Sequence, residues 1–433
     1  MKTTMRTAVG TAVAALTLAA CTSTGPTVVH GPSEDPATSP SSAAAQPAAR
    51  GVEAPIASVP WSQVGPGWTL ATWSPVTGAG YGDQPRPGEP TPQTAATTLY
   101  LVDPAGGRYA ISTFPAPGEN HGLRTKLFDW SGDGRRALLE EFDSRSDKTT
   151  MIDFDLATGA RQSFTLDGHV VGAYTRPTGK AILLSRSAIG DLPAMLKRVD
   201  LTGAEQLTYP IDQLGDAGKF NDKYLDDQYL AAPDGTHLVL GAANGMAVMG
   251  NDGVLGRHLS VPGQLTRCSP VRWWTSSVIL ANCRQPNSSS ASQLWQVPLD
   301  GGAPTPLTAV NSGQGDDPGF DGDIADIGAW QLPSGTFIQS VAGCGAVFLS
   351  RLTPDMHTTR VDVPGVDNDS VFVEGATADK LVLQADLQAE KSCGSGVSLL
   401  LTYDPATNTA DVLLGGPLNG GGVIEVVPYP GQE

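Results

Sequence analysis

The sequence of 433 residues lacks the short motifs that mark the common catalytic sites. It contains no G-x-S-x-G nucleophile turn, no H-E-x-x-H metal motif and no glycine-rich phosphate loop. Cysteine and histidine are scarce, with five and six residues, and no C-x-x-C pair occurs. These absences argue against a serine hydrolase, a zinc enzyme, a nucleotide-binding enzyme and a thiol-redox protein.

The sequence also shows little helical periodicity and carries few positive charges. No window between residues 60 and 433 keeps an apolar helical period, and 51 glycines and 34 prolines would interrupt most helices. The 27 Lys and Arg face 44 Asp and Glu, which gives a net charge of −17. Such a surface repels nucleic acid and anionic headgroups. The excess charge either keeps the protein soluble or favours cationic or metal-bridged partners.

Long apolar runs are limited to one stretch near the N-terminus. Lys2 and Arg6 precede the uncharged stretch Thr7–Ala20, which suits a secretory signal and is too short to span a bilayer. The stretch ends in Leu-Ala-Ala before Cys21, which resembles the lipobox of bacterial, actinobacterial-type surface lipoproteins. The resemblance implies cleavage after a signal peptide of residues 1–20 and a diacylglycerol on Cys21. An ordinary signal cut near the same alanines is the alternative.

Residues 21–58 are dominated by Pro, Ser, Thr, Ala and Gly, and contain no aromatic residue. Such a composition predicts a disordered tether. Two acyl chains anchor a protein stably, and the tether would span roughly 30–40 Å. We therefore expect a protein anchored to the outer face of the cytoplasmic membrane that faces the cell wall or the exterior.

The remaining residues, 59–433, carry a repeat. An extended segment followed by an acidic turn recurs seven times, at intervals of 45 to 55 residues, with the turns marked by Asp103, Asp155, Asp200, Asp252, Asp300, Asp355 and Asp404. Each unit also has an earlier turn followed by an apolar strand. This period fits one four-stranded propeller blade. We predict an all-β domain, a single β-propeller of about seven blades, although six or eight also fit.

The two turns of each unit resemble those of the TolB-like and WD-repeat-like propeller family, whose blades carry a Ser-Pro-Asp-Gly turn. Residues 232–235 and 131–134 come closest to that turn. The resemblance covers about residues 60–430 and implies the fold, but says little about function. We expect the C-terminal strand, 421–430, at the hub of the first blade beside Trp68–Trp73, with Ile56–Trp61 as a competitor for that position.

Four cysteines follow Cys21, and an even number in an exported protein favours two disulfides. Cys268 and Cys283 flank a predicted hairpin, and Cys344 and Cys393 each begin the third strand of a blade, in neighbouring blades six and seven. We favour the pairs Cys268–Cys283 and Cys344–Cys393 over the other two connectivities, with a structural role.

The candidate binding residues lie in long connections opposite the acidic turns, at 74–96, 211–228 and 311–328. Asp316, Asp317, Asp321, Asp323 and Asp326 could hold Ca²⁺ through oxygen ligands, and a solvated acidic loop is the alternative. Trp130, Trp274 and Trp330 recur before the first turn of their blades. Packing between blades explains this recurrence better than a sugar-stacking ring.

Two functions of different class remain. The first is a non-catalytic, monomeric binding or scaffold module for an envelope protein, a peptide or a wall polymer. The second is a propeller enzyme, such as a polysaccharide lyase or glycosidase, with or without Ca²⁺. The missing motifs favour the first, and no catalytic residue is assigned. Convergent carboxylates, arginines and histidines with shifted pKa values at the channel mouth would favour the enzyme.

Overall fold

The computed structural model describes residues 47–76, 88–117, 125–187, 193–219, 229–242, 245–285, 291–387 and 397–430. They belong to one compact unit, Ala45–Glu433. Cys21, Cys393, the predicted signal peptide and most of the predicted tether lie outside the described residues. Among the described residues, strands dominate, and helical turns are limited to η1 (Ile56–Ser58), η2 (Ile211–Lys219), η4 (Gly343–Gly345) and α1 (Gly416–Asn419).

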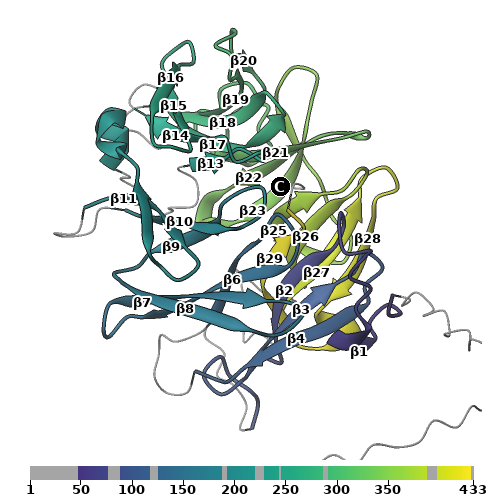
Figure 1. Ribbon diagram of the computed structural model, residues 1–433. Coiled ribbons are helices and arrows are strands. Elements are labelled where there is room, and N and C mark those ends of the chain that lie inside the picture. Colours follow the sequence, from purple (N-terminus) through teal and green to yellow (C-terminus); the bar gives the residue numbers. More distant parts are fainter. Residues whose placement is uncertain are drawn as a thin grey trace, which may run out of the picture. The chain divides into compact units, whose positions relative to one another are not determined.

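The strands form seven antiparallel blades in chain order (Figure 1). The first blade contains β29 (Gly422–Pro428), β2 (Thr69–Ser74), β3 (Thr97–Val102) and β4 (Arg108–Phe114), with β1 (Glu53–Pro55) added at its edge. The second contains β5 (Thr125–Trp130), β6 (Arg136–Asp143), β7 (Lys148–Asp155) and β8 (Arg161–Asp167). The third contains β9 (Val171–Tyr174), β10 (Ala181–Arg186), β11 (Met195–Asp200) and β12 (Glu205–Thr208).

The fourth blade contains β13 (Tyr229–Ala231), β14 (His237–Ala242), β15 (Gly245–Gly250) and β16 (Leu255–Leu259). The fifth contains β17 (Arg267–Thr275), β18 (Val278–Arg284), β19 (Ser292–Pro298) and β20 (Thr305–Pro306). The sixth contains β21 (Ala325–Leu332), β22 (Gly335–Val341), β23 (Val347–Leu352) and β24 (Thr358–Arg360). The seventh contains β25 (Val366–Ala376), β26 (Leu381–Leu387), β27 (Ser398–Asp404) and β28 (Thr409–Leu414). A single parallel bridge, Val347 to Ser370, joins the last two.

The seven repeated aspartates lie where the third strand of a blade passes into the turn before the fourth, as predicted. Asp155, Asp200 and Asp404 are the last residues of their strands, and the other four lie in the turn. Their carboxylates are used locally. Asp155, Asp200 and Asp404 each accept hydrogen bonds from the backbone N–H groups of the next residues in the turn, at 2.8–3.4 Å. An aspartate that bonds the backbone two residues on fixes a tight reversal of the chain. Repeated aspartates such as these therefore serve to stabilise the turns.

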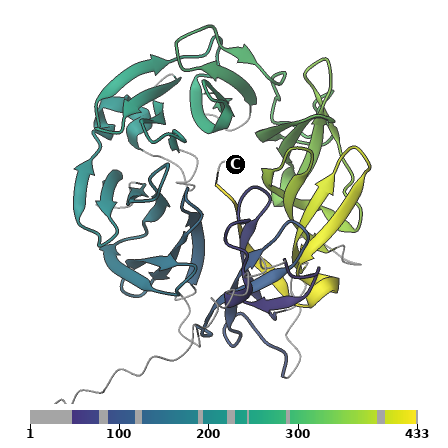
Figure 2. The ribbon, with the colours of Figure 1, turned by 45° about the vertical axis from the view of Figure 1, so that its right-hand side comes forward.

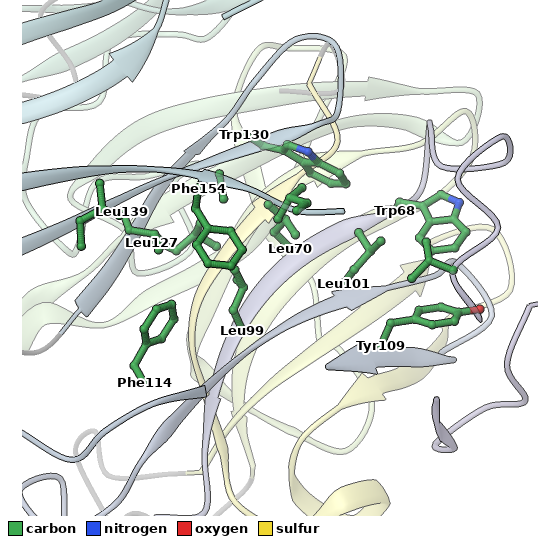
Figure 3. Close-up of a cluster of buried hydrophobic side chains, with 14 residues drawn as sticks. Trp68, Leu70, Leu99, Leu101, Tyr109, Phe114, Leu127, Trp130, Leu139 and Phe154 are labelled. Carbon is green, nitrogen blue, oxygen red and sulfur yellow. The ribbon is translucent and has the colours of Figure 1, made fainter. Parts of the chain in front are cut away.

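The apolar core is divided into seven clusters, and each cluster lies between two neighbouring blades. Strand periodicity produces this division, because successive side chains point to opposite faces of a sheet. On β10, Ile182 and Leu184 pack toward the second blade while Leu183 packs toward the fourth. Figure 2 shows the blades following one another around a circle. The cluster between the first two blades, around Trp130 and Phe154, is drawn in Figure 3.

The C-terminal strand closes the circle at the predicted position. β29 pairs antiparallel with β2, with Leu70 opposite Val427, and forms the inner strand of the first blade. Val423 and Val426 pack with Val382 and Leu400 of the seventh blade. One blade thus combines both ends of the chain, so neither the first nor the seventh blade keeps an open face.

The predicted competitor for this position, Ile56–Trp61, lies elsewhere. β1 pairs in parallel with the outer strand β4, and the buried Val59 packs into the cluster between the first two blades. The backbone N–H of Ala48 also donates to the Tyr109 hydroxyl at 2.8 Å. The folded unit therefore begins before residue 59, where the prediction placed the end of the tether.

One of the two predicted disulfides is present. Cys268 and Cys283 face each other across the β17–β18 pair, with their Cα atoms 4.0 Å apart and their sulfurs bonded. This confirms the predicted pairing across a hairpin. Cys344 is exposed in the turn between β22 and β23 and has no disulfide partner among the described residues. The Cys344–Cys393 pair stays a prediction.

Candidate functional site

Each blade has two ends of different character. Because the strands are antiparallel, the turns between first and second and between third and fourth strands lie at one end, which we call the turn face. These turns are short, as at 103–107 and 201–204. The second-to-third connections and the links between blades lie at the other end, which we call the insertion face. The long connections 75–96, 209–228 and 307–324 begin and end at this face, and the first two are only partly described.

The 307–324 connection holds most of the aspartates predicted as a calcium cage, but the structure divides the set. Asp316 is exposed, Asp317 accepts from the Ser312 N–H at 2.7 Å, and Asp321 accepts from the Arg360 N–H at 3.1 Å. Asp323 and Asp326 are instead fully buried. In the described part of the chain, no group of three or more His, Cys, Asp or Glu side chains comes together to hold a metal ion. The five do not form one cage because Asp323 and Asp326 are buried, whereas Asp316 and Asp321 are exposed and Asp317 is half-buried.

The two buried aspartates belong to a group of polar side chains between the fifth and sixth blades, which we call the polar cluster. Its members are all less than 9% exposed: Asn282, Asn311, Asp323, Asp326, Ser340, Ser350 and Thr358. Asn311 donates to one oxygen of Asp323, and Thr358 donates to the other at 2.9 Å. The apolar cluster at this interface is the smallest of the seven, so polar groups take the place of apolar packing here.

Burial shifts the ionisation of both carboxyl groups. Desolvation raises the pKa of Asp323 to about 6, against hydrogen bonds from Thr358, Ser340 and Asn311 that lower it. Desolvation, followed by repulsion from Asp323, raises the pKa of Asp326 well above its usual value. One oxygen of Asp326, Oδ2, is buried without a hydrogen-bond partner. Two buried carboxyl groups that repel each other destabilise the folded state, and such a pair is unusual in a packed interface.

A second buried polar network joins the second and third blades. Arg136 donates from Nε and Nη2 to the two oxygens of Asp153, and the Tyr174 hydroxyl donates to Asp153 Oδ1 at 2.6 Å. Asp129 accepts from the Tyr174 N–H at 2.7 Å and from the Arg176 guanidinium. Every acid here has a basic or hydroxyl partner, so the network fixes one blade against the next.

This network was not predicted. Asp129 and Asp153 occupy strands, and only their placement beside Arg176 and Arg136 shows that they are paired. An alternating strand pattern with an acid at an inward position is the one signal in the sequence that could have drawn attention to them.

The described inner strands show no catalytic constellation. Glu374 on β25 is half-buried, and desolvation raises its pKa to about 7. Glu425 on β29 pairs with the Thr72 hydroxyl. His169 approaches the buried Glu140 at 3.6 Å, while His357 lies 3.3 Å from Asp355 on the turn face. Glu374, Glu425 and the two His–acid pairs are at four different blades, and none of them converges on another. The described residues therefore do not favour the lyase or glycosidase alternative.

The three recurring tryptophans pack between blades, as the sequence favoured. Trp130 is fully buried between the first two blades, Trp274 packs at the interface of blades five and six, and Trp330 packs at that of six and seven. The guanidinium of Arg272 lies 4.9 Å from the ring centre of Trp330. A sugar-stacking ring would need exposed rings, which this arrangement does not provide.

A hollow on the insertion side of the fourth blade has a volume of about 210 Å³ and is lined by residues that include Leu214, Leu255 and His258. Sites for small organic ligands usually measure roughly 300–1,000 Å³. No helix among the described residues has the length and apolar character needed to cross a membrane.

Comparisons with solved structures find propeller-containing proteins that are similar to this chain at low identity. No family model and no curated protein matches the sequence. Among solved structures, TolB from Acinetobacter baumannii shares 13% identity with a TM-score of 0.42, and the match covers 83% of this chain and 66% of TolB. The chain is a β-propeller. The β-propeller domain of the Trilobed protease from Pyrococcus furiosus shares 11% identity with a TM-score of 0.47, over 80% of this chain and 92% of that domain.

An acylaminoacyl peptidase from Pyrococcus horikoshii shares 10% identity with a TM-score of 0.46. That match covers 80% of this chain and 50% of the peptidase. The propeller thus spans just under two thirds of TolB and half of this peptidase. At these identities the likeness concerns the fold alone.

Proposed function

We propose that this chain is a lipid-anchored, non-catalytic binding module that presents the insertion face of its propeller to an envelope protein, a peptide or a wall polymer. The observation that carries the proposal is the asymmetry between the two faces. The long connections 75–96, 209–228 and 307–324 begin and end at the insertion face, whereas the described turns of the turn face are short reversals, with aspartates such as Asp200 and Asp404 bonded to the neighbouring backbone. Long connections on one face of a repeat array commonly form its binding surface.

Binding fits the described residues better than catalysis does. An acid–base reaction needs two groups within reach of one substrate atom, with pKa values tuned to their tasks. Here the strongly perturbed carboxyl groups, Asp323 and Asp326, are closed off between blades, and Glu374 lies on a different blade. The hollow beside His258 is also smaller than a typical small-molecule site. These features support recognition of an extended surface.

The anchor rests on the sequence. The Leu-Ala-Ala-Cys sequence at residues 18–21 would place a lipid at Cys21, and the segment that follows would hold the propeller near the outer face of the membrane. In this arrangement a module without catalytic groups acts by holding its partner close to the membrane. The net charge of −17 favours a partner with a cationic surface.

Affinity capture from intact envelope tests the proposal. Immobilised residues 45–433 should retain a defined partner, and retention should fall when NaCl is raised from 0.05 to 0.3 M, since salt screens exposed charges. Asp147→Lys, in the connection between β6 and β7 on the insertion face, should weaken capture. Asp379→Lys, the same charge reversal at an exposed turn-face position, should leave capture unchanged. Equal effects of the two variants would contradict the assignment of the face, and hydrolysis of a wall polymer by the fragment would contradict the non-catalytic role.

A further inference from the structure

The interface between the fifth and sixth blades has an unusual composition. Its apolar cluster contains five buried residues, whereas the cluster between the first two blades contains fourteen. The remaining space is filled by the oxygen-rich polar cluster beneath the 307–324 connection. Buried polar groups usually have hydrogen-bond partners, and where they lack them the deficit requires an explanation.

Donor hydrogens are too few for the acceptors in this cluster. Ser340 has one hydroxyl hydrogen, yet its Oγ lies 3.4 Å from Asp326 Oδ1 and 2.9 Å from Ser350 Oγ, and it also bonds Asp323. The second oxygen of Asp326 has no partner at all, although the residue is fully buried. Asp326 is therefore the least satisfied carboxyl group of the cluster.

The negative charge of the polar cluster also lacks a neutralising partner. Asp323 and Asp326 repel each other. The hydrogen-bond donors that reach their carboxylates, from Asn311, Thr358 and Ser340, are all neutral. Buried charges are ordinarily paired with an opposite charge or coordinate a metal ion. The available atoms are carboxylate and hydroxyl oxygens, which suit hard cations and not zinc or copper.

We propose that Asp323, Asp326 and Ser340 bind one Ca²⁺ ion between the fifth and sixth blades. Two carboxylates neutralise the double charge of the ion, and the hydroxyl oxygen of Ser340 adds a neutral ligand. Ca²⁺ accepts an irregular set of oxygen ligands more readily than Mg²⁺, which demands a regular octahedron. The ion links the connection that enters the sixth blade to the β21–β22 pair, so its role is structural and goes beyond the binding function proposed above.

The test uses residues 45–433, which contain all seven inter-blade clusters. After removal of metals with a chelator at pH 7.5, 5 mM CaCl₂ should raise the Tm by about 3 °C, as expected for a ligand at roughly a hundred times its Kd on a domain of this size. Calorimetric titration with Ca²⁺ should give one site per chain. MgCl₂ at the same concentration should give a smaller shift.

Matched variants separate the site from a general effect of acidic residues. Asp326→Asn should remove the calcium-dependent shift, and in chelator it should melt no lower than the wild type, because one unpaired buried charge is gone. Asp316→Asn, on the exposed part of the same connection, should keep the full shift. The proposal is overturned if calcium gives no shift, if Mg²⁺ matches it, or if the shift survives Asp326→Asn. In the first case, the two carboxyl groups share a proton instead.

Discussion

Asp153 shows how a single buried charge stabilises the contact between two blades. Its carboxylate is fully buried, binds Arg136 through both oxygens and accepts from the Tyr174 hydroxyl. Removing one member of a buried ion pair leaves the other desolvated and unpaired. We expect Asp153→Ala to lower the free energy of unfolding by about 3 kcal/mol, measured by urea denaturation.

The exposed pair Lys148–Asp167 provides the control. Its charges lie 3.2 Å apart, but the Asp167 side chain is 84% exposed. Exposed ion pairs contribute little because water and salt screen them. Asp167→Ala should therefore match the wild type in the same assay. If Asp153→Ala and Asp167→Ala lowered the free energy of unfolding equally, the Asp153 network would contribute no more to stability than an exposed ion pair.

Glu374 supplies a prediction about pH. Burial raises its pKa from 4.5 to about 7, so the folded state binds this proton more tightly than the unfolded state. The stabilising contribution is then full below about pH 4.5 and is lost as the pH rises toward 7. Glu374→Gln cannot lose a proton, and it should gain stability relative to the wild type between pH 4.5 and 8, by on the order of 1 kcal/mol or more.

Urea midpoints of Glu374→Gln and the wild type, measured at several pH values, provide the readout. Because other titrating groups are common to both proteins, the difference between the two isolates Glu374. A difference that is constant with pH, or that grows toward acid, would contradict the raised pKa.

For individual residues, the sequence predicted the interactions that are made with close neighbours along the chain. The turn aspartates follow from a short pattern, since an Asp that bonds the next backbone N–H groups needs only its own neighbours, as at Asp200. The roles of Asp153 and Asp326 depend on residues of other strands, which a linear reading does not bring together. The five acids of the 307–324 connection and β21 looked alike in sequence, and only the fold separates Asp316 from Asp326.

Among the elements, β29 has the largest predicted effect. It is the inner strand of the first blade and packs Val423 and Val426 against the seventh. Deleting residues 422–433 removes the contact that joins the ends of the circle, and we expect a loss of cooperative unfolding and a tendency to aggregate, because β2 becomes an exposed edge. Thermal unfolding followed by circular dichroism would show this.

The edge strand β1 offers a matched deletion at the other terminus. It pairs only with the outer strand β4, and its removal, by deleting residues 47–58, leaves every blade with its four main strands. That variant should still unfold in one cooperative transition at a lower temperature. If the two deletions had similar effects, closure through β29 would not be the basis of the domain's stability.

The repeat predicted these elements well because strand alternation and turn residues are local signals. The prediction that residues 421–430, and not Ile56–Trp61, take the inner position of the first blade is confirmed by the pairing of β29 with β2. The role of residues 53–55 as a parallel edge strand was not predicted, since a short segment without alternation carries no signal of its pairing.

For the whole molecule, the proposed lipid anchor on Cys21 would determine where the propeller acts. Cys21→Ser removes the thiol that would carry the diacylglycerol, so the protein should lose labelling by radioactive palmitate and leave the membrane fraction. Cys268 and Cys283, which are bonded to each other, cannot substitute for it. Unchanged labelling and membrane retention in the variant would contradict the anchor.

At this scale a ring of about seven blades could be predicted, with six or eight also compatible, because the period repeats along the chain. The partner could not be predicted. Binding surfaces depend on the connections between strands, which vary independently of the repeat. In this chain those connections carry the acidic residues whose roles the sequence left open.

Photo-crosslinking from opposite faces tests the central claim most directly. A benzoylphenylalanine would replace Ser144 or Gln285 on the insertion face, and in separate variants Thr202 or Ala406 on the turn face, all at exposed positions. After irradiation in intact envelope, the account predicts one discrete covalent adduct from Ser144 or Gln285 and none from Thr202 and Ala406. Adducts formed only from the turn face would contradict it.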